Sequence, residues 1–119
     1  MACVKLREIK EKLGLTLLTT NISDLLDREV SKAFVSDLLS NALANAPRKG
    51  LLITLQTHMN VIAVAVHCEL YAVIFVQGRT AEKEVIDKAE EEKILLFASD
   101  KTAFDIAGEL YAMGIRGSD

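Results

Sequence analysis

Three short polar segments each follow an apolar run, and they hold the side chains of this sequence best suited to binding a charged ligand. They are Gln56-Thr57-His58, Gln77-Gly78-Arg79-Thr80 and Ser99-Asp100-Lys101-Thr102. Imidazole and guanidinium groups can donate hydrogen bonds to an anion, and hydroxyl groups can bond either to backbone or to a ligand. Glycine lets the backbone come close to a bound group. These residue types therefore suggest recognition of a small polar or anionic ligand.

The apolar runs before these segments predict where the segments meet. Residues 51–55, 72–76 and 94–98 read LLITL, AVIFV and ILLFA, which fits strands buried on both faces. Helix-length segments follow at 58–70, 80–93 and 101–114, and this alternation is typical of right-handed parallel crossover units. We therefore expect an α/β fold with a mostly parallel sheet, built from β-α-β units with helices on both faces. Ligands commonly bind at the carboxyl edge of such a sheet.

The candidate ligand-binding residues lie in the three segments and in the helix after the first. The full set is Gln56, Thr57, His58, Asn60, Gly78, Arg79, Ser99 and Thr102. A simpler interpretation stays open, because Thr57, Thr80 and Ser99 are also residue types that cap helix N-termini. A charged His58 is unexpected at a helix start, since the helix dipole disfavours a cation there. Either a partner compensates for the charge or the imidazole is neutral.

The first half of the chain is less regular. Apolar residues at helical spacing predict an amphipathic helix over 4–13 that ends at Gly14, and 15–20 reads as a strand. Residues 21–27 predict a turn or helical corner, 29–36 a half-buried strand, and 37–46 a helix that Pro47 terminates. In the second half, the charge-rich stretch 81–93 predicts an outer, solvated helix. With 119 residues, we expect a single domain over 1–119.

Catalytic and metal-site signatures are missing from the sequence. His58 and His67 are nine positions apart, which places them on roughly opposite faces of a helix, so one metal cannot reach both. Cys3 and Cys68 have no metal-ligand or redox spacing. The Gly-rich loop ending in Gly-Lys-Ser or Gly-Lys-Thr, which a P-loop kinase needs, is not present. We therefore expect no catalytic residues, no metal and no cofactor.

Charge and hydropathy limit the partners and the location that we expect for this protein. The net charge is −3, and Lys and Arg are scattered among Asp and Glu, which argues against nucleic-acid binding. Charges interrupt the N-terminal segment, unlike a signal peptide, and the apolar runs are shorter than the roughly 20 residues of a membrane span. We expect a cytoplasmic protein. The helix over 58–70 is apolar nearly all round and needs cover on several sides, so a homodimer interface is a natural hypothesis.

The stretch 51–107 resembles the DRTGG domain, and LREIKEKLGL at 6–15 and REVSKAFVSDLLS at 28–40 agree with it in order and spacing. The resemblance is closest to stand-alone DRTGG proteins of anaerobic bacteria and archaea. These carry stretches similar to 35–40 and to Gln56-Thr57-His58-x-Asn60-Val61. They are often labelled serine kinases through similarity to the N-terminal domain of HPr kinase/phosphorylase, which is not the kinase half.

The resemblance implies an α/β domain like that N-terminal domain. DRTGG domains also occur between CBS domains in regulatory pyrophosphatases and in front of phosphate acetyltransferases, as regulatory or dimer-forming modules. This sequence departs from the name motif. It has Gln56-Thr57-His58 where typical members read Gly-Asp-Arg, and Val76-Gln77-Gly78 where they read Thr-Gly-Gly.

Taken together, these features predict a non-catalytic regulatory module that forms a dimer and senses a small polar, anionic or nucleotide-like ligand. One alternative is a pure interaction module without a ligand, docking on a protein such as a redox enzyme or a sensor kinase. A third interpretation is a phosphotransferase, as the serine kinase label suggests.

Overall fold

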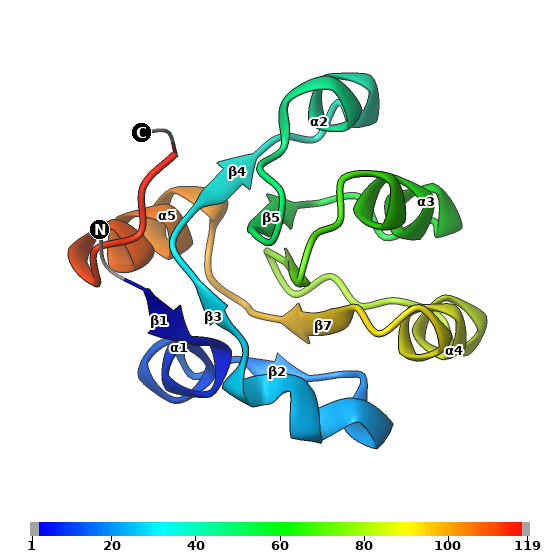
Figure 1. Cartoon of the computed structure of the whole chain (residues 1–119), viewed down its shortest axis with the longest axis horizontal. Helices are drawn as coiled ribbons and strands as arrows, with labels where there is room; N and C mark the ends of the chain where they lie inside the picture. The colour runs from blue at the N-terminus through cyan, green and yellow to red at the C-terminus, as the bar shows by residue number, and fades with distance from the viewer. Residues whose placement is uncertain (1–2, 118–119) are drawn as a thin grey trace.

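The computed structural model describes residues 3–117 and has two layers of helices around a central β-sheet (Figure 1). In chain order the elements are β1 (Val4–Lys5), α1 (Leu6–Leu13), β2 (Thr16–Leu17), the 3-10 helix η1 (Thr20–Asp27), β3 (Glu29–Val30), β4 (Ala33–Val35), α2 (Leu39–Asn45), β5 (Leu51–Thr54), α3 (Met59–His67), β6 (Ala72–Phe75), α4 (Lys83–Glu91), β7 (Leu95–Ala98) and α5 (Ala103–Ala112).

The main sheet has five strands in the order β2-β7-β6-β5-β4. Strands β4 to β7 pair in parallel, and β2 pairs antiparallel with β7 at one edge. Because β4 to β7 are neighbours in chain order, right-handed crossovers place α2, α3 and α4 on the same face. Helices α1 and α5 cover the other face (Figure 1). The predicted α/β fold, with a mostly parallel sheet and helices on both faces, is confirmed.

Alternating side chains of the sheet pack into two hydrophobic cores, one on each face. Leu52 and Val73 point to the face of α2, α3 and α4, whereas Ile53 and Ile74 point to the face of α1 and α5. These four side chains are completely buried. The all-apolar runs in the sequence therefore form strands that are covered on both sides, as parallel strands are.

Two short elements differ from expectation. Val4–Lys5 forms β1, which pairs antiparallel with β3, so the first helix begins at Leu6 and not at residue 4. The prediction of one strand over 29–36 is wrong, because the strand ends at Val30 and a separate strand begins at Ala33. Strand β3 pairs with β1, and β4 joins the main sheet beside β5.

Helix α3 is apolar but only partly covered. Its buried side chains are Val61, Ile62, Val64 and Ala65. Ala63 and Val66 stay exposed, Val66 to 43% of its surface. Helix α2 lies beside α3, and the Cys68 thiol just after α3 donates to the carbonyl oxygens of Ala42 and Leu43 at 3.5 Å. One face of this helix therefore remains free for another contact.

None of the helices formed by residues 3–117 has both the length and the apolar character that a membrane span requires.

Candidate functional site

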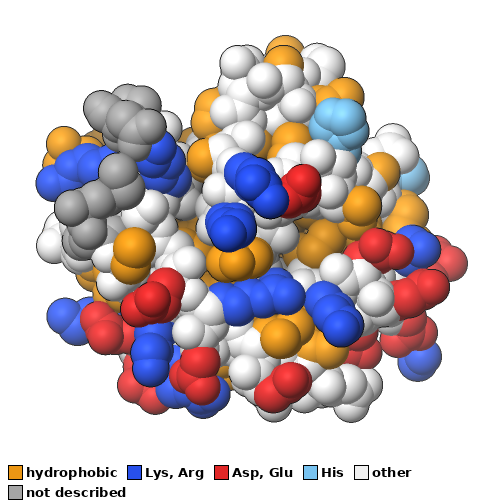
Figure 2. Space-filling view, in the orientation of Figure 1, with side chains coloured by type: hydrophobic (Ala, Val, Ile, Leu, Met, Phe, Trp, Pro, Cys, Tyr) orange, Lys and Arg blue, Asp and Glu red, His pale blue; other side chains and the backbone are white. Residues whose placement is uncertain are grey.

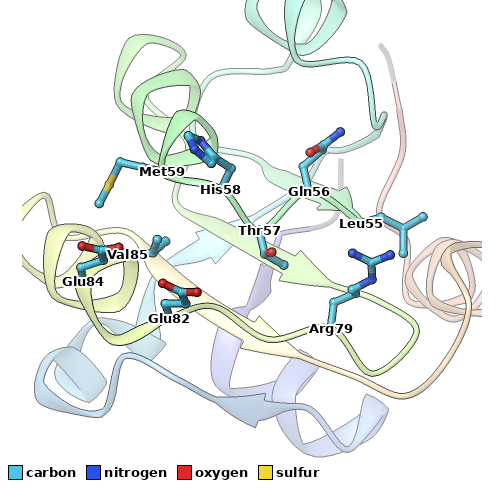
Figure 3. A pocket seen from close by; sticks show the side chains of 9 residues that line it. All are labelled: Leu55, Gln56, Thr57, His58, Met59, Arg79, Glu82, Glu84 and Val85. Carbon is cyan, nitrogen blue, oxygen red and sulfur yellow. The ribbon is translucent and has the colours of Figure 1, made fainter.

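A cavity of about 280 Å³ opens between the loop from β5 to α3 and the loop from β6 to α4 (Figure 3). It brings together four of the predicted residues, Gln56, Thr57, His58 and Arg79. The complete lining is Leu55, Gln56, Thr57, His58, Met59, Arg79, Glu82, Glu84 and Val85. We refer to it as the strand-end pocket.

The other four predicted residues lie outside this pocket. Gly78 and Ser99 line a smaller cavity of about 130 Å³ near the β2 edge, which Arg79 also lines. Asn60 lines a groove between α2 and α3. Thr102 caps α5, where its hydroxyl accepts the Asp105 N–H at 3.2 Å. The three polar segments thus meet at one edge of the sheet but divide between neighbouring sites, with Arg79 between two of them.

The helices begin later than the capping interpretation assumed. The N-caps are His58 for α3, Glu82 for α4 and Thr102 for α5, and the Glu82 side chain makes no capping bond. Thr57, Thr80 and Ser99 are therefore not N-caps, and that interpretation is wrong. Ser99 instead accepts the Lys101 N–H at 3.1 Å, in a turn that delays the helix. The Thr57 hydroxyl makes no hydrogen bond within the described chain.

His58 caps its helix through the imidazole ring. Its Nδ1 accepts the Asn60 N–H at 3.2 Å, so this nitrogen carries no proton. A neutral imidazole with its proton on Nε2 fits this geometry and avoids placing a cation at the positive end of the helix dipole. Of the two possibilities that the sequence left open, the structure thus favours the neutral ring. His58 can offer the pocket an N–H donor without a charge.

A tight turn after β6 positions Arg79. Gln77 and Gly78 both have positive φ, 58° and 73°, and the Arg79 N–H donates to Val76 O at 3.2 Å, as in a type I′ turn. The turn is fixed to the loop after β7, because Gln77 N–H donates to Lys101 O and Gly78 N–H to Ser99 O, both at 2.9 Å. The backbone that carries Arg79 is therefore held against the loop after β7.

Asp37 fixes the loop that supplies the other pocket residues. Its Oδ1 accepts the Thr54 hydroxyl at 3.1 Å and the Leu55 N–H at 2.7 Å, and its carbonyl oxygen accepts the Gln56 side-chain amide at 3.1 Å. Asp37 belongs to the stretch 35–40 that carried part of the resemblance. The two quoted stretches therefore contact each other, and Asp37 was missing from the predicted set.

The Arg79 side chain has no hydrogen-bond or ion-pair partner within residues 3–117. A guanidinium offers five N–H donors in a planar fork, the geometry that recognises carboxylate or phosphate. Because its backbone is fixed and its donors are free, this side chain can serve an incoming acceptor. No group of three or more His, Cys, Asp or Glu side chains in the described part of the chain is arranged to hold a metal ion.

Comparison with known proteins defines the class of fold. A scan against protein-family models and a search of curated proteins find no match. A solved structure that the chain resembles contains the CBS and DRTGG domains of the regulatory region of Clostridium perfringens pyrophosphatase, complexed with its activator, diadenosine tetraphosphate. The TM-score is 0.73 at 15% identity, and the match covers 92% of this chain and 46% of that chain. The chain has a DRTGG-like α/β fold.

Proposed function

We propose that this chain is a non-catalytic regulatory module that binds a small polar or anionic ligand in the strand-end pocket. The observation that carries the proposal is the unpartnered guanidinium of Arg79, held on a fixed turn beside a 280 Å³ cavity. Thr57 and His58 add a hydroxyl and an imidazole to the same cavity. A cavity with a few convergent polar groups is the usual form of a small-molecule site.

The similar pyrophosphatase region carries a nucleotide activator, so nucleotides belong among the ligands to be tested. The experiment is a thermal-shift screen of the full chain against adenine and guanine nucleotides, diadenosine tetraphosphate, inorganic phosphate and small carboxylates. A ligand at 100 times its Kd adds about 2.7 kcal/mol, which raises the Tm of a domain of this size by several degrees.

Matched arginine variants test the site. Arg79→Gln is expected to abolish the shift, whereas Arg48→Gln, at an exposed guanidinium paired with Glu69, is expected to keep it. No shift with any ligand, in a protein that melts cooperatively, would exclude a ligand-binding role for these compounds. A shift that both variants retain would place the ligand elsewhere.

We also propose that the module is a homodimer joined through the exposed face of α2 and α3. Neither helix contains Asp, Glu, Lys or Arg. Leu43 and Val66 are 44% and 43% exposed on them. In Figure 2 the surface over α2 is mostly white and orange, while red and blue gather over α1 and α4. An uncharged face with exposed apolar side chains is typical of the centre of a protein interface.

Grooves on both sides of α3 fit this packing. One, of about 420 Å³, lies against α2, and the other, of about 460 Å³, lies against α4. Ala63 and His67 line both, so the exposed edge of α3 forms a ridge between two grooves. Ridges that fit into grooves are how helices pack, and a two-fold axis presents the same surface on both subunits.

Sedimentation of the wild type and two variants tests the dimer. Val66→Asp places a carboxylate on the proposed face and is expected to give a monomer at concentrations where the wild type is dimeric. Phe104→Asp is the matched control, because Phe104 is 87% exposed on α5, on the other side of the sheet. A monomeric wild type at tens of micromolar, or dissociation by the control alone, would contradict the proposal.

The same uncharged face favours the second candidate, an interaction module that docks on another protein. A stable one-to-one complex with a purified partner that Val66→Asp abolishes, together with a monomeric free chain, would support it over the homodimer.

A further inference from the structure

The strand-end pocket holds unpaired charges of both signs. In Figure 3 the Arg79 side chain lies on one side of the cavity and those of Glu82 and Glu84 on the other. Within residues 3–117, none of these three side chains makes a hydrogen bond or an ion pair. Other charged side chains of α4 do pair, such as Lys83 with Asp87 at 2.8 Å. The charges that line the pocket are therefore left free.

This charge pattern disfavours a ligand that is simply anionic. A phosphate or a carboxylate bonded to Arg79 gains one attraction but shares the cavity with two carboxylates. The repulsion from the two carboxylates opposes the attraction to Arg79, because both interactions follow the same dependence on charge and distance. A simple cation meets the opposite problem at Arg79. With a neutral His58, the arrangement suits a ligand that carries one charge of each sign.

The remaining walls set the size and polarity of the ligand. Leu55, Met59 and Val85 line the cavity with apolar surface. Its volume of about 280 Å³ lies just below the roughly 300–1,000 Å³ of sites for drug-sized molecules. The ligand that fits is therefore small, with one compact apolar group. Met59 is unbranched and flexible, so it can adapt to that group.

We propose that the strand-end pocket binds an α-amino acid with an apolar side chain. Its carboxylate bonds to Arg79, its ammonium group lies toward Glu82 and Glu84, and its side chain packs against Met59 and Val85, which lie on the side of the two carboxylates in Figure 3. Acidic residues in a first helical turn are favoured by the helix dipole alone, but the dipole does not account for the free guanidinium across the cavity. This inference rests on the proposed function and specifies the ligand of the same site.

Calorimetry with the full chain tests the charge requirement directly. The probes are L-leucine, L-valine, L-methionine and L-phenylalanine, with glycine as the ligand that lacks an apolar side chain. Two analogues of leucine each lack one charge: 4-methylpentanoate has no ammonium group, and 3-methylbutylamine has no carboxylate. We expect at least one of the four amino acids to bind, and the leucine analogues to bind about tenfold or more weakly than leucine if leucine is the tightest.

Charge-neutralising variants test which pocket side chain binds the ammonium group of the ligand and which binds its carboxylate. Glu82→Gln/Glu84→Gln is expected to abolish the preference for the amino acid over its analogue without the ammonium group. Arg79→Gln is expected to abolish the preference for the amino acid over the amine, which lacks the carboxylate. Glu91→Gln, further along α4 and paired with Lys88 at the surface, is the matched control and is expected to change neither preference. Melting without ligand verifies that each variant folds.

The outcomes separate this inference from the proposed function. Phosphate or a nucleotide that binds through Arg79, while all four amino acids fail to bind, overturns the amino-acid assignment and leaves a ligand-binding module. Amino-acid binding that survives in the Glu82→Gln/Glu84→Gln variant with its preference intact also overturns the assignment. Failure of every ligand in both screens overturns the assignment and the proposed function together.

Discussion

At the scale of the residue, His58 has a structural role that can be separated from ligand binding. Its Nδ1 accepts the Asn60 N–H at the start of α3. Replacing a capping residue by alanine costs about 0.5–2 kcal/mol, because a backbone N–H loses its acceptor. We expect His58→Ala to lower the free energy of unfolding, measured by urea denaturation, by about 1 kcal/mol.

The variant His58→Asn distinguishes the two roles, since asparagine also caps a helix but has no imidazole. We expect it to be within about 0.5 kcal/mol of the wild type in stability. If His58→Asn is as unstable as His58→Ala, the imidazole contributes more than the capping bond. If His58→Asn keeps the stability of the wild type, the ligand affinity of this variant reports the loss of the imidazole alone.

The two thiols are expected to differ in reactivity. Burial raises the pKa of Cys68 from its ordinary value of 9.0, which keeps it protonated at neutral pH, while Cys3 is exposed. Since the thiolate is the reactive form, iodoacetamide at pH 7.5 should modify Cys3 well before Cys68, as followed by peptide mass spectrometry. Equal rates of modification of Cys3 and Cys68 in the folded protein would contradict this.

The raised pKa of Cys68 also determines how its contribution to stability changes with pH. Because the pKa of Cys68 is higher in the folded state, its contribution to stability is fully present below about pH 9. It is lost as the pH rises through the folded-state pKa, since the unfolded chain ionises first. A Cys68→Ala variant should therefore lose less stability than the wild type when the pH rises above 9.

The sequence could predict a pocket residue only where neighbouring residues in the chain indicate its position. His58 and Arg79 stand directly after apolar strands, so their position was readable from the neighbouring residues. Asp37 bonds to a loop 17 and 18 residues away, and a single sequence contains no local sign of that contact. Glu82 and Glu84 lie at the start of a charge-rich helix, where side chains facing a pocket look the same in the sequence as solvated ones.

At the scale of the element, the turn after β6 depends on glycine. Gly78 has a φ of 73°, and a Cβ there would lie 3.3 Å from Asp100 Oδ1. Alanine is strained in this backbone region, by about 1–2 kcal/mol. We expect Gly78→Ala to lower the free energy of unfolding by about that amount in urea denaturation.

Gln77 provides the opposite test in the same turn, since it has a φ of 58° without being glycine. Gln77→Gly should relieve the strain and leave stability unchanged or raise it by a few tenths of a kcal/mol. Destabilisation by both substitutions, to the same extent, would show that contacts of the side chains and not the backbone angles determine this turn.

Elements defined by their own residues were predictable, and elements defined by distant partners were not. Strands β5, β6 and β7 are continuous apolar runs and lie where the sequence placed them. Strands β1 and β3 have two residues each and exist only through the pairing of Val4 with Val30 and of Lys5 with Glu29. The helix α3 was identified from its length, but its exposed face depends on how α2 and α4 flank it.

At the scale of the whole molecule, one sheet belongs to both hydrophobic cores. Adjacent residues of β5 serve different cores, since Leu52 packs under α2, α3 and α4 and Ile53 packs under α1 and α5. Neither core can lose its sheet face without exposing the other. The two cores are therefore expected to unfold together, as small single domains usually do.

This cooperativity predicts the same behaviour from substitutions in either core. Leu52→Ala and Ile53→Ala should each lower the free energy of unfolding by about 2–5 kcal/mol, because both remove completely buried methyl groups and leave a cavity. Each should keep a single transition in urea, with coincident curves from far-UV circular dichroism and from tyrosine fluorescence. The surface variant Leu38→Ala, at a side chain that is 66% exposed, is the control and should change stability by less than about 0.5 kcal/mol. A biphasic curve in one variant but not the other would mean that the two helical layers unfold separately, and that the shared sheet does not couple them.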